Sequence, residues 1–200
     1  MQHIGIYGGT FSPPHVGHAH AARIFLEEGG IDTLTVIPTY LTPLKEREEW
    51  TSAEDRLAMC RLAFSFSSRV AVSDIEVRRE GRSYTADTLE ALSAPDVKLS
   101  FLCGTDMLLS MDTWHDPARI FRLATIVCMR RETDSENTER LFKKATEYKE
   151  RFGADVRFLS QKPIILSSSE IRGRLLRGED CSPFLEGSVL SYIRERGLYR

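Results

Sequence analysis

Short apolar runs alternate with longer amphipathic stretches along the whole chain. The apolar runs are rich in Val, Ile, Leu and Phe and have the length and composition of buried strands. They cover residues 3–8, 32–39, 69–77, 97–104, 125–131 and 156–161. The segments between them have helical length, so the pattern predicts strands that alternate with helices.

Two of the intervening segments show clear helical spacing. Residues 15–30 place Ala22, Phe25 and Leu26 on one face. Residues 52–64 start with Ser52, which precedes Asp55 as an N-cap. This second helix then sets Leu57, Cys60, Arg61 and Phe64 at helical spacing. The charged run 130–151 predicts a solvated helix with a preceding loop.

Strands that alternate with helices pair in parallel through right-handed crossovers. The sequence therefore predicts an α/β fold with a doubly wound parallel sheet, in which ligands bind at the carboxyl ends of the strands. The 200 residues fit one domain, and neither a repeat nor a Pro/Ser linker divides them. We expect a single domain over 1–200, with 166–200 as its C-terminal helical part.

Composition and charge limit the classes of partner that this chain is expected to bind. Hydrophobic residues make up 42% of the chain and charged residues 28%, which is typical of a globular protein. A formal net charge of −2 predicts no nucleic-acid partner, so phosphate binding needs a local site. No targeting segment or long apolar run is evident, which predicts a cytoplasmic protein without a membrane span. The four scattered cysteines are expected to be buried, reduced thiols.

The motif that indicates a binding site most strongly is GGTFSPPHVGH at residues 8–18, directly after the first predicted strand. Gly8 and Gly9 allow the backbone to turn sharply and approach a ligand, while Pro13 and Pro14 stiffen the turn. The helix that begins near His15 then presents free N–H groups. This arrangement predicts a phosphate-binding site.

His15 and His18 are three residues apart, so both imidazoles face one side of the first helical turn and can donate to a triphosphate. Two other interpretations are that the histidines begin the helix without a functional role, or that they form a zinc site together with His20. Zinc is disfavoured because no acidic or thiol ligand accompanies them. The motif also lacks the GxGxxG and GK[ST] patterns, which disfavours a dehydrogenase and a Walker-type ATPase.

GGTFSPPHVGH resembles the GGTFDPxHxGH signature of HxGH-motif nucleotidyltransferases, specifically that of nicotinate-nucleotide adenylyltransferases. A second stretch, LSSSEIR at 166–172, resembles the ISSTxIR motif that closes the ATP site in that superfamily. Two departures are Ser12, where the family more often has Asp, and Ser169, where threonine is usual. The resemblance extends over nearly the whole chain and implies a Rossmann-like nucleotidyltransferase fold.

LSSSEIR also has a direct physical interpretation. Ser167 and Glu170 have the spacing of a capping box, which puts Ser168 and Ser169 at a helix N-terminus and projects Arg172 from the first turn. Such a group binds anions well, although an ordinary capped surface helix would have the same pattern.

Two further stretches resemble this family in its acceptor site: SYTADTL at 83–89 and GTDMLLSMDTW at 104–114. A nicotinate ring needs an aromatic platform and donors for its carboxylate. The resemblance assigns the platform to Trp114, beside Tyr84, and the donors to backbone amides near Thr85 and His115. Taken alone, the two aromatic residues would more often belong to a core.

The same resemblance matches Lys45 to a basic position near the reacting phosphates. Arg130, with Arg131, ends the fifth predicted strand on the expected ligand side, from which it could reach the mononucleotide phosphate, although arginines are common at strand ends. Asp106 could alternatively cap the next helix. The residues assigned to ATP are Gly8, Gly9, Thr10, Phe11, Gly104, Asp106, Ser167, Ser168 and Ser169.

The resemblance implies adenylyl transfer from ATP to nicotinate mononucleotide, which gives nicotinic acid adenine dinucleotide and pyrophosphate. No protein nucleophile is needed, so catalysis would consist of alignment and charge neutralisation by His15, His18, Lys45 and Arg172. Mg²⁺ would be held mainly by ATP phosphates, with no protein ligand. The alternatives are nicotinamide mononucleotide or phosphopantetheine as acceptor, or a non-catalytic nucleotide-binding regulator. A homo-oligomer is compatible with the sequence.

Overall fold

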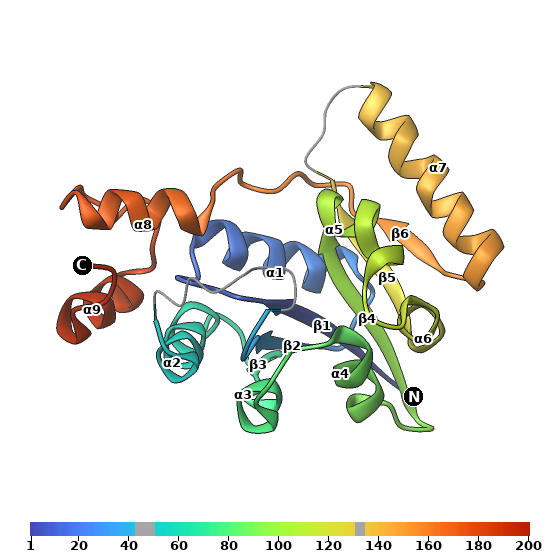
Figure 1. The fold of residues 1–200 in the computed structure, drawn as a ribbon, viewed down its shortest axis with the longest axis horizontal. Coiled ribbons are helices and arrows are strands. Elements are labelled where there is room, and N and C mark those ends of the chain that lie inside the picture. The colour runs from blue at the N-terminus through green and yellow to red at the C-terminus, as the bar shows by residue number, and fades with distance from the viewer. Residues whose placement is uncertain (43–50, 131–134) are drawn as a thin grey trace.

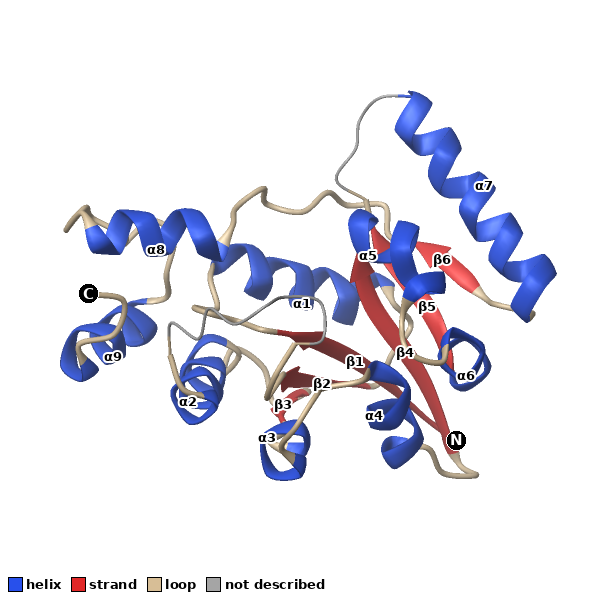
Figure 2. Cartoon of the chain, viewed as in Figure 1, coloured by secondary structure: helices blue, strands red, loops and turns tan. Residues whose placement is uncertain are grey.

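The computed structural model describes residues 1–42, 51–130 and 135–200. Six parallel strands form one sheet in the order β3-β2-β1-β4-β5-β6 (Figures 1 and 2). The strands are β1 (Gln2–Gly9), β2 (Thr33–Pro38), β3 (Val70–Val72), β4 (Val97–Gly104), β5 (Ala124–Met129) and β6 (Val156–Phe158). The predicted doubly wound α/β sheet is therefore confirmed.

The helices fall between the strands as the pattern predicts. In chain order they are α1 (Val16–Glu28), α2 (Ala53–Ala63), α3 (Ile75–Arg79), α4 (Thr85–Leu92), α5 (Thr105–Ser110), the 3₁₀ turn η1 (Met111–Thr113), α6 (Pro117–Leu123), α7 (Ser135–Phe152), α8 (Ser168–Leu176) and α9 (Gly187–Arg196). The last two form the helical C-terminal part of the chain, at the opposite end of the molecule from α7 (Figure 1).

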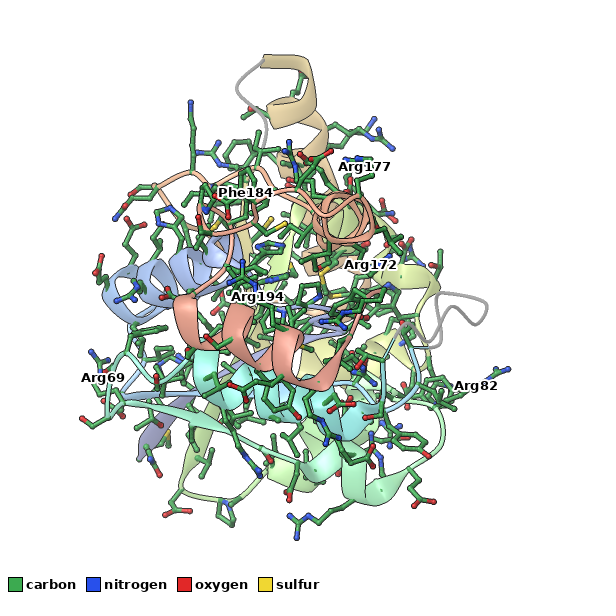
Figure 3. All side chains as sticks on the ribbon, turned by 90° about the vertical axis from the view of Figure 1, so that its left-hand side faces the viewer. Arg69, Arg82, Arg172, Arg177, Phe184 and Arg194 are labelled. Carbon is green, nitrogen blue, oxygen red and sulfur yellow. The ribbon has the colours of Figure 1, made fainter. Side chains whose placement is uncertain are left out.

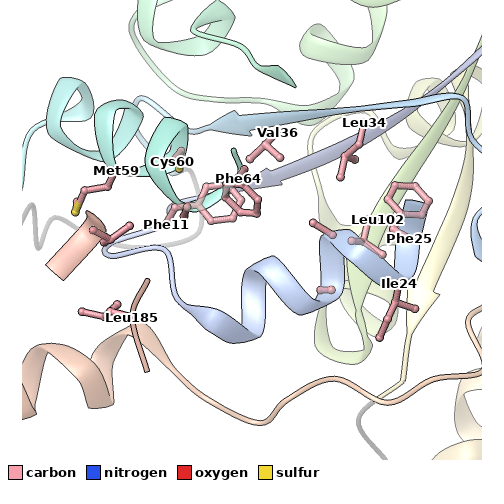
Figure 4. Close-up of a cluster of buried hydrophobic side chains, with 14 of the residues drawn as sticks. Phe11, Ile24, Phe25, Leu34, Val36, Met59, Cys60, Phe64, Leu102 and Leu185 are labelled. Carbon is pink, nitrogen blue, oxygen red and sulfur yellow. The ribbon is translucent and has the colours of Figure 1, made fainter. Parts of the chain in front are cut away.

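Two hydrophobic clusters cover the two faces of the sheet, because alternate strand residues point to opposite sides. Leu102 and Val127 pack with residues of α1, α2 and α9 in one cluster (Figure 4). Phe101 and Ile126, their neighbours in sequence, pack with residues of α4, α6 and α7 in the other. The fold thus has three layers, as expected for a doubly wound sheet.

Close packing of α1 on the sheet depends on a glycine in β1. Phe25 of α1 is fully buried, and a Cβ atom added at Gly5 would lie 2.8 Å from its ring and 2.3 Å from Ile31 Cδ1. Any larger residue at position 5 would therefore push α1 away from the strand whose end carries the glycine-rich motif.

One predicted strand is wrong in its second half. The chain pairs with β2 only as far as Val72, after which Ser73 accepts a hydrogen bond from the backbone N–H of Ile75 and α3 begins. Ile75 packs against the core from this short helix, and Glu76 is also buried. The alternation of apolar residues in 69–77 fits an edge strand and a helical turn equally well, so periodicity could not separate them.

The other predictions differ only at their ends. β5 stops at Met129 and β6 at Phe158, so Arg130 lies just after its strand. All four cysteines are buried and free, as expected. Within the described ranges, no helix has both the length and the apolar character needed to cross a membrane.

Candidate active site

Three adjoining cavities open at the carboxyl ends of β1 and β4, where the strand order changes direction. This is the point at which doubly wound sheets bind ligands. A large cavity of about 710 Å³ adjoins a strand-end cavity of about 230 Å³, and the two share Gly8, Gly9 and Asp106. A third, the helix-start cavity, measures about 270 Å³ and shares His15 and His18 with the strand-end cavity. The two histidines therefore lie where the strand-end and helix-start cavities meet.

Residues 8–14, which we call the nucleotide loop, form the common wall of the three cavities. Gly9 accepts a hydrogen bond from the backbone N–H of Thr39 at 2.9 Å, which ties the loop to the end of β2. Phe11 has φ +50° and is only 2% exposed, so its side chain is buried. The ring lies where a Cβ atom on Gly9 would be 2.9 Å from it, so glycine is needed at position 9 for this close contact.

His15 and His18 cap the start of α1 reciprocally. His15 Nδ1 accepts from the backbone N–H of His18 at 3.3 Å, and His18 Nδ1 accepts from the backbone N–H of His15 at 3.2 Å. The two rings stack with their centroids 3.6 Å apart. A ring nitrogen that accepts a hydrogen bond carries no proton, so each neutral ring holds its proton on Nε2. The helix start thus fixes the tautomer of both rings.

The predicted shared face of these histidines is confirmed by this stacking. His15 is 4% exposed, whereas His18 is half-buried. His20 points elsewhere, because its ring Nε2 lies 3.0 Å from the backbone oxygen of Lys162. Among the described residues, no group of three His, Cys, Asp or Glu side chains is placed to hold a metal ion.

The start of α8 closes the helix-start cavity from the opposite side. Ser168 Oγ donates to the Pro13 carbonyl at 2.9 Å, and Arg172 Nη1 donates to the Ser12 carbonyl at 2.8 Å. Arg172 Nη2 also donates to Ser169 Oγ at 3.0 Å. Ser167, Ser168, Ser169 and Arg172 all line the cavity together with both histidines. Two motifs about 150 residues apart are thereby brought together, as predicted.

The capping box predicted for α8 is only half present. Ser167 Oγ accepts from the backbone N–H of Glu170 at 3.1 Å, which is the expected N-cap. The Glu170 carboxylate instead pairs with Arg174 at 3.0 Å, one turn further along the helix. An ion pair at this spacing competes with the return hydrogen bond to the cap, and here it prevails.

The large cavity brings together the residues predicted for the acceptor. Tyr84, Thr85, Trp114 and His115 all line it. The Tyr84 and His115 rings lie 4.3 Å apart, and Trp114 is half-buried with its ring edge-on to Phe101 at 6.2 Å. The segment before Trp114 is fixed to α7, because Tyr148 donates to the Leu108 carbonyl at 2.8 Å and accepts from the backbone N–H of Asp112 at 3.2 Å.

Gly104 ends β4 and Asp106 lies in the first turn of α5, where both line the strand-end cavity. The alternative role for Asp106 is wrong, since Gly104 is the N-cap of α5 and no side chain caps that helix. Arg130 does not line any of the three cavities, and its guanidinium lies 5.8 Å from the Phe158 ring and 5.9 Å from that of Phe142. Lys45 falls outside the described residues, so its assignment stays a prediction.

Two buried charged residues of this region do not follow from the motifs. Arg56 of α2 is 4% exposed and donates to the backbone carbonyls of Thr10, Thr39 and Tyr40. Glu76 of α3 lines the large cavity and accepts a hydrogen bond from the Thr88 hydroxyl. Burial raises the pKa of the Glu76 carboxyl, and its hydrogen bonds oppose that rise. The predicted apolar face of this helix contained Arg61 and not Arg56, so helical spacing did not indicate Arg56.

Comparison with known proteins places this geometry in a family. A family model described as cytidylyltransferase-like matches residues 6–174. A protein of Neisseria meningitidis serogroup B, named "Probable nicotinate-nucleotide adenylyltransferase", is 38% identical over 100% of this chain and 99% of its own length. A Gemmatimonas aurantiaca protein of the same name is 35% identical over 98% and 92%. This chain belongs to the nicotinate-nucleotide adenylyltransferase family.

Solved structures agree on the fold of this adenylyltransferase family member. The Plasmodium falciparum nicotinic acid mononucleotide adenylyltransferase complexed with NaAD is similar, with a TM-score of 0.78, 20% identity, and coverage of 100% of this chain and 98% of that one. A Vibrio parahaemolyticus structure, titled a putative nicotinate-nucleotide adenylyltransferase, has a TM-score of 0.63 at 19% identity. At these identities the likeness concerns the fold, and it confirms the Rossmann-like nucleotidyltransferase prediction.

Proposed function

We infer that this chain transfers the adenylyl group of ATP to nicotinate mononucleotide and forms nicotinic acid adenine dinucleotide and pyrophosphate. The observation that carries this inference is the position of His15 and His18 where the helix-start and strand-end cavities meet. The strand-end cavity in turn shares Gly8, Gly9 and Asp106 with the large cavity. On one side lies an anion-binding group of serines and Arg172, and on the other a cavity lined by aromatic rings. A triphosphate and a planar acceptor can therefore meet at the nucleotide loop.

In the proposed reaction, the acceptor phosphate attacks the α-phosphorus of ATP in line and pyrophosphate leaves. The Nε2–H groups of His15 and His18 donate to the triphosphate as charge moves onto the leaving oxygens. Arg172 and the α8 N-terminus receive the pyrophosphate end. Because no covalent intermediate is needed, the protein contributes position and preorganised donors.

We propose that adenosine occupies the strand-end cavity and the acceptor occupies the large cavity. The strand-end cavity is lined by Gly8, Gly104 and Asp106. Trp114 and Tyr84 would sandwich a flat ring in the large cavity, and the N-terminus of α4 at Thr85 would offer backbone N–H groups to a carboxylate. These assignments give residues 1–200 one common site, which supports their action as one domain.

We propose that Mg²⁺ enters with ATP. The polar side chains that line the helix-start cavity can all donate hydrogen bonds and include no carboxylate, and the described residues hold no carboxylate cluster for a cation. These residues do not form a metal site of their own. Phosphate oxygens and water are then the ligands that Mg²⁺ retains.

The acceptor is tested by pyrophosphate release from the purified protein with ATP and Mg²⁺. We expect the highest kcat/KM with nicotinate mononucleotide, compared with nicotinamide mononucleotide and phosphopantetheine in parallel reactions. A preference for either rival would keep the chemistry and change the acceptor. No release with any of the three would instead favour a nucleotide-binding regulator.

Removing the aromatic platform should weaken acceptor binding selectively. We expect Trp114→Ala to raise the KM for nicotinate mononucleotide by roughly tenfold, which corresponds to the loss of one stacking contact. The KM for ATP should stay near the wild-type value, since Trp114 does not line the strand-end or helix-start cavity. Trp114→Phe should retain most of the affinity, and equal losses for both substrates would contradict the platform role.

A further inference from the structure

A buried hydrogen bond joins the nucleotide loop to the C-terminus of the chain. Ser12 Oγ lies 3.1 Å from the hydroxyl oxygen of Tyr199, although the two residues are 187 positions apart. Ser12 is 8% exposed and Tyr199 only 3%. Ser12 also lines the helix-start cavity, so this contact lies directly behind the surface that faces the proposed triphosphate.

The backbone on both sides of this contact is conformationally costly. Tyr199 has φ +58° and Phe11, next to Ser12, has φ +50°, in the left-handed region that most L-residues avoid. Tyr199 reaches its position because Gly197, the C-cap of α9, is also left-handed, and the backbone N–H of Leu198 donates to the Ile193 carbonyl at 3.0 Å. Residues in this conformation are retained where the surrounding contacts hold them in place, so the position of Tyr199 is fixed by contacts within the fold.

The donor and acceptor in this contact follow from the chemistry of the two hydroxyls. Burial raises the pKa of Tyr199, with the Ser12 hydrogen bond and the charges of Arg172 and Arg56 acting against the rise, so the phenol stays protonated near neutral pH. A phenol is more acidic than an aliphatic alcohol and is therefore the better donor. With Tyr199 donating to Ser12 Oγ, the single proton of Ser12 is left to donate elsewhere.

We propose that Tyr199 is a positioning residue for ATP, which orients the Ser12 hydroxyl toward the phosphate groups in the helix-start cavity. This inference rests on the proposed function in assuming that the cavity holds the triphosphate. Arg172 fixes the Ser12 carbonyl and Arg56 fixes that of Thr10 at 3.0 Å, so backbone movement of the loop is already restricted. Tyr199 adds a restraint on the Ser12 hydroxyl, which lines the helix-start cavity.

The test is a double-mutant cycle of Ser12→Ala, Tyr199→Phe and the combined variant. We expect each single variant to raise the Kd for ATP, measured by calorimetry, and the KM for ATP by about three- to tenfold, the effect of one lost hydrogen bond. The KM for nicotinate mononucleotide should not change. Because both single variants break the same chain of hydrogen bonds, the combined variant should be no worse than the more affected single variant.

The control is Tyr192→Phe. Tyr192 on α9 donates its hydroxyl to Asp55 at 2.8 Å, so this variant also removes one tyrosine hydrogen bond from the C-terminal part. It should lower the thermal midpoint to a similar extent and leave the Kd for ATP unchanged. An unchanged Kd in Tyr199→Phe, a rise of the same size in Tyr192→Phe, or additive effects in the cycle would overturn the proposal.

This design separates the inference from the proposed reaction. ATP affinity is measured without turnover, so the cycle can be completed whether or not dinucleotide forms. A wild-type protein that binds ATP but releases no pyrophosphate with any acceptor would refute the reaction only. If the wild-type protein turns over and the variants of the cycle bind ATP with the wild-type Kd, only the role of Tyr199 is refuted. Ser12→Ala, which removes one oxygen from a loop, tests the link even where Tyr199→Phe folds poorly.

Discussion

Replacing His18 with alanine should lower kcat by roughly two to three orders of magnitude, the scale of losing one preorganised donor at the site of developing charge. The half-buried His18 ring lines both the strand-end and the helix-start cavity. Its Nδ1 accepts a hydrogen bond from the backbone N–H of His15, so Nε2 is the nitrogen of the neutral ring that carries the proton. The loss should fall on kcat more than on the KM for ATP, because the donor acts mainly in the transition state.

Two conservative variants separate this role from helix capping. Asparagine can retain an acceptor near the position of Nδ1, so His18→Asn should keep the stability of α1 but show the same low kcat as alanine. Glutamine can present a donor near the position of Nε2, so His18→Gln should recover part of the rate. His20→Ala, on the same helix, should stay near the wild-type rate. A His18→Asn enzyme with normal turnover would remove this histidine from the mechanism.

The expected effect of His18 depends on a local structure that the sequence only partly predicts. Spacing alone places both imidazoles on one face of the helix. The reciprocal caps that fix their tautomer depend on the backbone conformation at His15, whose φ of −139° is extended rather than helical. Spacing therefore predicts that the two imidazoles share one face, and the structure adds which nitrogen of each neutral ring carries the proton.

Strands were predictable wherever burial on both faces left a continuous apolar run, as in 97–104, where the predicted and observed bounds agree. Prediction failed at the sheet edge, where β3 pairs with only one neighbour and 73–77 turns into α3. At an edge, the choice between strand and helix is made by tertiary packing, which a local pattern does not contain.

The residues missed by sequence reasoning act through contacts that are distant in the chain. Helical spacing drew attention to Arg61, which is exposed, while Arg56 on the same helix is buried. Tyr199 lies two residues from Gly197, beyond the last helix, where no periodicity operates. Motifs identify the groups that touch ligands because they are contiguous, whereas the side chains that position those groups come from any part of the fold.

Arg56 holds the ends of two neighbouring strands together. Its guanidinium donates to Thr10 in the nucleotide loop at 3.0 Å and to Tyr40 after β2 at 2.9 Å. The backbone N–H of Tyr40 in turn donates to Ser83 Oγ at 2.9 Å, one residue before Tyr84 in the large cavity. One side chain thereby connects the proposed phosphate site with the proposed acceptor site.

We expect Arg56→Met to lower the free energy of unfolding by about 3 kcal/mol or more, because methionine fills similar space but leaves buried carbonyl oxygens without their donor. Denaturant unfolding monitored by circular dichroism measures this change. In protein that remains folded, the KM values for both substrates should rise together, since both loops lose a common restraint. Arg56→Lys should recover only part of either effect, because an ammonium group cannot reproduce the planar fork.

Arg69 offers the matched control at the opposite ends of the strands. It also donates to backbone carbonyls, those of Ile31 at 2.5 Å and Asp32 at 2.8 Å, which precede β2. Arg69 itself is exposed at the surface, immediately before β3 (Figure 3). Arg69→Met should cost about 1 kcal/mol, since water can replace its hydrogen bonds, and it should leave both KM values unchanged. If Arg56→Met behaved like Arg69→Met in both measurements, the two loops would not depend on a shared arginine. If it lost stability but kept both KM values, Arg56 would stabilise the fold without positioning either substrate.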